Sequence, residues 1–164
     1  MDAVHIHLML NHLPVLATPL GFILLLFGFV WKNRTLRTTA LGLFVLAAVA
    51  VIPVYLTGEP AEEVVESLPG VQEGIIDQHS DLGKLGFIGS GVLGLLALVV
   101  LIRYRGKSEF PVQAGILLLA TSAISCGVLI QTAYLGGQVR HTEIRAGSVT
   151  PVQAVNEKEN EARE

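Results

Sequence analysis

The chain has 164 residues, of which 51% are hydrophobic and 15% are charged. Soluble domains carry about 25% charged residues, and four long apolar blocks in a chain of this length leave too little polar sequence to cover a water-soluble core. The composition therefore excludes an ordinary soluble domain. The basic residues gather in short loops, a pattern that reports membrane topology and not nucleic-acid binding.

Four apolar blocks without Asp, Glu, Lys or Arg are each long enough to cross a bilayer, namely residues 13–31, 40–56, 85–102 and 112–135. They predict an all-α fold: a transmembrane four-helix bundle with up-down-up-down topology. With the outer loop, residues 57–84, the blocks form one domain over residues 1–146. The polar segment that follows, residues 147–164, is predicted to be a disordered tail.

The first span follows a histidine-rich segment, residues 1–12. Proline is tolerated in the first turn of a helix, so one interpretation begins the helix near Leu13. The other begins it near Asp2 and bends it at Pro14. The segment has no Lys or Arg and no small-residue cleavage pattern after it, so we expect the first span to remain in the mature protein.

The two short connections, residues 32–39 and 103–111, hold six of the eleven Lys and Arg residues and one acid, Glu109. The other side of the predicted bundle carries the remaining 13 of the 14 acidic residues. The positive-inside rule places the basic connections in the cytoplasm. We therefore expect a multi-pass protein of a bacterial inner membrane with both termini in the periplasm.

The outer loop predicts two helices. Pro60 and the acids around it suit the first turn of a short amphipathic helix on the outer membrane surface, which ends at Leu68-Pro69-Gly70. No proline occurs between Val71 and Tyr104, which predicts one helix about 50 Å long against a hydrocarbon core of roughly 30 Å. Its start should project from the membrane. The fourth span either continues through Gly136-Gly137 or stops there.

All five histidines fall on the predicted outer side of the membrane. His79 lies six residues before the third apolar block, and His141 lies six residues after the fourth, so we expect these two to lie at one level and share a cofactor. His12 adjoins the first block. The candidate iron ligands are His12, His79 and His141, followed by His7 and His5.

Small residues lie below His79 on one helical face, beginning with Gly83 and Gly86. They leave room for a flat macrocycle, although close helix packing is the commoner use of such a stripe. On the fourth span, Tyr134 and Gly137 lie on or near a polar face that ends at His141, which we expect to face the bundle interior. These residues complete the candidate cofactor contacts.

Three interpretations of the histidines stay open. Haem b needs one or two axial imidazoles in an apolar pocket. Copper or zinc uses histidine with carboxylates, which the outer loop supplies. The third interpretation has no cofactor and interfacial histidines. Cys126 is the only cysteine, which excludes an internal disulfide and c-type haem attachment.

The chain resembles a broad group of uncharacterised small bacterial four-helix membrane proteins. The resemblance covers about residues 5–145 and rests on His-x-Pro at residues 12–14, Thr-Gly-Glu-Pro-Ala-Glu-Glu at residues 57–63, His79, and Gly-Gly-x-x-x-His at residues 136–141. That group is distantly similar to four-helix cytochromes b, which implies haem binding by helix-borne histidines. This chain departs from many of them because no histidine lies on the cytoplasmic side.

The leading functional interpretation is a small redox subunit. A b-type haem near the periplasmic face would pass electrons between quinol in the bilayer and a periplasmic partner such as a cytochrome. One alternative is a non-enzymatic anchor or assembly subunit of a larger membrane complex, and another is a metal-handling protein. The sequence contains no Ser-His-Asp pattern, Walker loop or dinucleotide fingerprint, which suits the anchor interpretation. We expect an electron-transfer subunit and not a stand-alone enzyme.

Overall fold

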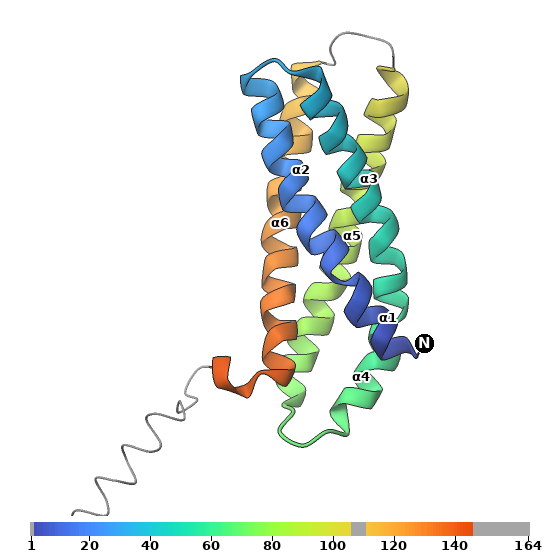
Figure 1. Ribbon diagram of the computed structural model, residues 1–164, viewed down its shortest axis with the longest axis vertical. Coiled ribbons are helices and arrows are strands. Elements are labelled where there is room, and N and C mark those ends of the chain that lie inside the picture. The colour runs from blue at the N-terminus through green and yellow to red at the C-terminus, as the bar shows by residue number, and fades with distance from the viewer. Residues whose placement is uncertain (1, 106–110, 146–164) are drawn as a thin grey trace, which may run out of the picture.

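The structure, a computed structural model, describes residues 2–105 and 111–145. Its main body is an antiparallel bundle of four long helical segments (Figure 1). These are α1 with α2 (Ala3–Leu10 and His12–Val30), α3 (Arg34–Leu56), α5 (Glu73–Arg103) and α6 (Val112–Arg140). All four segments are long and apolar enough to cross a membrane, which confirms the predicted all-α transmembrane bundle.

The first segment breaks at Asn11 because of Pro14. Proline has no N–H to donate to the Leu10 carbonyl, and its ring crowds that turn, so the helix is interrupted there. The first part, α1, begins after Asp2, whose side chain accepts the N–H of His5. It leaves the line of α2 and packs across the end of α3 and against the short helix α4, Gly58–Glu66 (Figure 1). The interpretation with a bend at Pro14 is the correct one.

The third long helix is uninterrupted, as predicted, and its bounds lie within two residues of the expected ones. It follows a turn at Gly70, where φ is +80°. The last helix, α6, continues through Gly136 and Gly137 and does not stop there, so the first of the two alternatives for the fourth span is correct. The predicted tail, residues 147–164, lies outside the described residues.

The apolar core lies toward the end with the two short connections. It is built from the second halves of α2 and α5 and the first halves of α3 and α6: Leu25, Ala40, Leu41, Phe44, Leu93, Ala97, Val100 and Leu118. The opposite end carries α1, α4 and every histidine (Figure 1). Polar groups are therefore concentrated where the apolar core ends.

Close approach of helices explains most of the small-residue stripe on α5. A Cβ atom on Gly94 would clash with the Ala48 side chain and lie 3.1 Å from the carbonyl oxygen of Phe44. A Cβ atom on Gly86 would lie 3.1 Å from Leu129. Gly83 differs, because a Cβ atom there would meet nothing within 4 Å. The stripe serves packing at Gly86 and Gly94, whereas Gly83 leaves open space one turn beyond His79.

The two halves of the bundle are related by an approximate two-fold repeat that residue identities do not reveal. Helices α2 and α5 run in the same direction, and each packs on both α3 and α6 (Figure 1). Five buried residues of α2 each correspond to a buried residue 72 positions later in α5. In α2 they are Pro14, Thr18, Gly21, Leu25 and Gly28, and in α5, in the same order, Gly86, Ser90, Leu93, Ala97 and Val100. Five positions of α3 and the residues 78 places later in α6 behave in the same way: Arg37, Ala40, Phe44, Ala47 and Val51, with Gly115, Leu118, Ser122, Ser125 and Leu129.

Candidate functional site

His7 reaches the end of α3 because the break at Asn11 turns α1 toward that helix. Its ring is half-buried, and its Nδ1 lies 3.0 Å from the carbonyl oxygen of Val54. A carbonyl oxygen can only accept, so Nδ1 carries the proton and donates it. The tautomer that this bond selects leaves Nε2 with a free lone pair.

His79 makes the equivalent contact in the other half of the bundle. It lies 72 residues after His7, is also half-buried, and its Nδ1 lies 2.8 Å from the carbonyl oxygen of Thr132 on α6. That carbonyl lies 78 residues after the carbonyl of Val54. The same argument assigns the proton to Nδ1 and leaves Nε2 as an acceptor.

A glycine adjoins each ring, and at Gly136 the lack of a side chain is what leaves room for the imidazole. A helical side chain leans toward the N-terminus and covers the backbone one turn before it, so the residue at i+4 shields the carbonyl of residue i. The residues four places after Val54 and Thr132 are Gly58 and Gly136. A Cβ atom on Gly136 would lie 2.8 Å from Cε1 of His79, and one on Gly58 would lie 3.8 Å from Cε1 of His7.

The imidazole rings of His7 on α1 and His79 on α5 lie close together in an edge-on arrangement. Their centroids are 6.5 Å apart and their planes are inclined by 75°. Histidines that bind metals nearly always donate their other ring N–H to a carbonyl or carboxylate, which fixes the ring and makes the ligating nitrogen more basic. His7 and His79 both donate Nδ1–H to a carbonyl in this way, so Nε2 of each ring is left as an acceptor.

A third polar group adjoins the pair. Asn11 lies one helical turn after His7, and its Oδ1 is buried without a hydrogen-bond partner among the described residues. The position 72 residues later is Gly83, beside which there is open space. A buried amide oxygen without a partner is a group that needs a hydrogen-bond donor.

The other three histidines are exposed. The ring of His5 bonds to Asp2 at 2.7 Å, and Nδ1 of His12 lies 3.2 Å from the carbonyl of Leu8 in its own helix. The ring of His141 bonds to Glu143 at 2.9 Å. These three residues were predicted as ligands alongside the pair, but the structure places none of them in the half-buried site.

The expected pairing of His79 with His141 is replaced by the pairing of His79 with His7. His79 lies level with Thr132 and Gly136 on α6, whereas His141 ends that helix five residues later, about 7.5 Å farther along the axis. The apolar blocks of neighbouring helices end at different heights, so equal offsets from them did not give equal levels.

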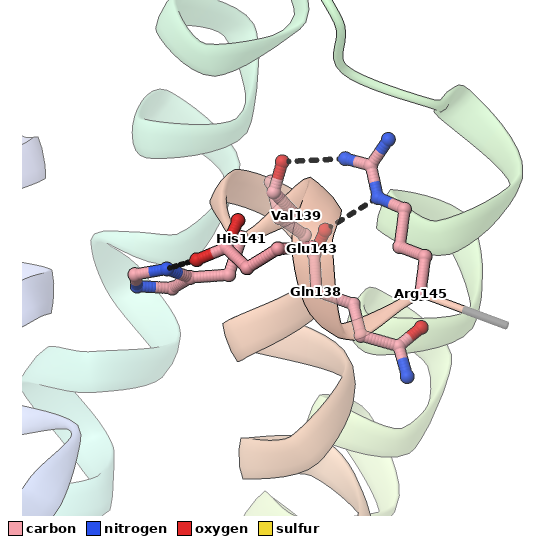
Figure 2. Close-up of polar contacts among 5 residues, drawn as sticks. All are labelled: Gln138, Val139, His141, Glu143 and Arg145. Atoms are coloured by element: carbon pink, nitrogen blue, oxygen red, sulfur yellow. Dashed lines mark hydrogen bonds and ion pairs between the residues drawn. The ribbon is translucent and has the colours of Figure 1, made fainter. Parts of the chain in front are cut away.

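Figure 2 shows what holds the end of α6. Arg145 folds back so that Nε and Nη2 donate to the carbonyls of Gln138 and Val139, at 2.8 and 3.0 Å. Its Nη1 also donates to the carbonyl of Gly70, which the figure does not draw. His141 points to the other side, toward Glu143. The pKa of Glu143 lies below its usual value because its own backbone N–H and the His141 ring hydrogen bond to the carboxylate. Arg145 fastens the helix end, and the sequence prediction did not include it.

The geometry can now be compared with known proteins. A family model described as "Predicted membrane protein (DUF2231)" matches residues 3–144. The chain belongs to the DUF2231 family. No curated protein and no solved structure matches it.

The DUF2231 match includes the whole histidine pair with both carbonyls and both glycines. It confirms the expected family of predicted membrane proteins. Two motifs that carried the resemblance supply one glycine each to the site: Gly58 from residues 57–63, and Gly136 from the Gly-Gly pair. Their role beside the histidine rings was not evident from the sequence.

The four other residues predicted to contact a cofactor lie in different surroundings. Gly83 borders the open space near the pair, and Gly86 packs against Leu129. Tyr134 is 52% exposed on the outside of α6, so the predicted polar face of that helix does not turn inward there. A Cβ atom on Gly137 would make only an ordinary contact, with Ile144.

Proposed function

We propose that this DUF2231 protein is a small membrane redox subunit that binds one b-type haem between His7 and His79. Electrons would pass between membrane quinol and a partner in the periplasm. One observation carries the proposal: two half-buried imidazoles, on equivalent positions of the two halves, each donate Nδ1–H to a helix carbonyl. Nε2 of each ring then remains for a metal.

The ring spacing suits two axial ligands on one iron. With metal–nitrogen bonds of about 2 Å, and ring centroids about 1.2 Å beyond each nitrogen, two imidazoles on opposite sides of an iron have centroids about 6.4 Å apart. Two imidazoles on a tetrahedral zinc ion would have centroids roughly 5 Å apart. The centroids of His7 and His79 are 6.5 Å apart, which favours the linear arrangement.

The number of possible metal ligands also favours haem over zinc or copper. Across residues 2–105 and 111–145, no group of three or more His, Cys, Asp or Glu side chains could hold a metal ion. Zinc and copper sites use three or four protein ligands, whereas haem needs only two axial ones. The open space beside Gly83 and the unpaired amide of Asn11 would adjoin the edge of the macrocycle.

A bound haem would supply a one-electron carrier. The chain would hold it with His7 and His79 and orient both rings through the carbonyls of Val54 and Thr132. Oxidation of one quinol releases two electrons and two protons, so two successive transfers would consume it. Exposed acids of α4, such as Glu59, Glu63 and Glu66, would present a negative surface to the periplasmic partner.

Reduction by quinol tests this function. The purified protein with haem should be reduced by a short-chain quinol as well as by dithionite, because the pair lies where the bundle meets the membrane surface. Rapid-mixing absorption spectroscopy measures both reactions. Reduction by dithionite but not by any quinol would remove quinol from the proposal and leave the haem site standing.

The orientation in the membrane belongs to the same proposal. We expect the histidine end to face the periplasm, because the opposite end carries the basic residues Lys32, Arg34, Arg103 and Arg105. An alkaline phosphatase fused after Glu164 should be active, and a fluorescent protein that folds only in the cytoplasm should stay dark. The reverse pattern would place the haem site in the cytoplasm.

A further inference from the structure

Two buried hydroxyl groups lie deep in the bundle at equivalent positions. Thr18 on α2 is 0% exposed and Ser90 on α5 is 1% exposed. Neither hydroxyl oxygen has a hydrogen-bond partner among the described residues. Thr18 and Ser90 are 72 residues apart, the same separation as His7 and His79, and each lies eleven residues after its histidine. Ser90 therefore lies about 16 Å farther along α5 than His79.

Leaving both hydroxyls unpaired would be costly. A buried polar group without a partner loses about 1–3 kcal/mol, and lipid offers no substitute. Serine and threonine within helices usually avoid this cost by bonding to a carbonyl of their own helix. Ser122 does so, since its hydroxyl bonds to the carbonyl of Leu119 at 3.0 Å. Thr18 and Ser90 do not, so their hydroxyls are available to a ligand.

The surroundings of the two hydroxyls are polar but uncharged. Ser125 on α6 is 2% exposed, and its Oγ lies 3.2 Å from where a Cβ atom on Gly89 would be, so a third hydroxyl is buried against α5. The apolar blocks that contain these residues have no Asp, Glu, Lys or Arg. Because no charge is available to balance an ion, a neutral ligand with both donor and acceptor capacity fits best.

We infer that Thr18 and Ser90 each bind an internal water within the bundle. Buried waters commonly satisfy otherwise unpaired polar groups in this way. This inference does not depend on the proposed haem, because the hydroxyls need a partner with or without it.

The sign of a stability change tests the inference. Thr18→Val and Ser90→Ala remove one hydroxyl each and nearly preserve volume. If water bonds both groups, each variant should melt about 2–4 °C lower than the wild type in detergent without haem. The double variant should lose about the sum of the two shifts, because each hydroxyl has its own water. Ser122→Ala is the control for removing a hydroxyl satisfied within its own helix.

An unpaired hydroxyl predicts the opposite result. Removing it relieves a desolvation cost, so single variants with unchanged or raised melting temperatures would overturn the inference. A high-resolution experimental structure gives a second readout if a variant fails to fold. Solvent density within hydrogen-bonding distance of the Thr18 or Ser90 hydroxyl supports the site. Its absence, where surface waters are well ordered, refutes it.

Discussion

Replacing His79 with alanine is expected to weaken haem binding by at least about 100-fold and to remove the Soret band at working concentrations. Loss of a group that only supports a metal ligand costs 10–100-fold, so loss of the ligand itself should cost more. His7→Ala should have the same effect, because His7 is the matching proposed ligand in the other half. Titration of haem into each purified variant, followed by absorption, measures the loss.

The exposed histidines provide matched controls. His141→Ala and His12→Ala should bind haem like the wild type, because their rings lie at the surface with partners of their own. If His141→Ala lost the band while His7→Ala kept it, the pairing of His79 with His141 suggested by sequence spacing would be correct after all.

Gly136→Ala should weaken haem binding by about 10–100-fold, the range expected when the support of a ligating histidine is lost. The new methyl group would lie 2.8 Å from Cε1 and 3.2 Å from Nδ1 of His79. The ring would have to move, and it would lose its bond to the Thr132 carbonyl. The same titration measures the effect.

The neighbouring glycine separates this effect from helix propensity. Gly137→Ala gains the same helix stability, about 0.5–1 kcal/mol, but its methyl group would have only an ordinary contact with Ile144 at 3.6 Å. Gly58→Ala should also be mild, since its methyl group would lie 3.8 Å from the ring of His7. Equal loss at Gly136 and Gly137 would show that the glycines serve the helix and not the ring.

The helices could be predicted because their causes are local. Span length and the absence of charge define the four membrane segments, and a lack of proline defines the long helix α5. Pro14 gave two alternatives for the first segment, since the sequence does not say whether residues before a proline are helical. The structure shows that they are, with a break at Asn11.

The pairing of the histidines could not be predicted because it depends on helix heights and rotations. The break at Asn11 determines where His7 points, and the contact with Thr132 determines the level of His79. Neither follows from distances along the sequence. The two-fold repeat was hidden for a related reason: equivalent positions share burial but not identity, as Phe44 and Ser122 illustrate.

The absorption spectrum of the wild-type protein, produced with ample haem and recorded before and after reduction by dithionite, tests the central claim most directly. The account predicts a coloured protein with one haem per chain and the sharp reduced bands of a six-coordinate, low-spin iron with two imidazole ligands. A colourless protein that also fails to take up added haem would contradict it. The anchor-subunit interpretation would then replace the redox one.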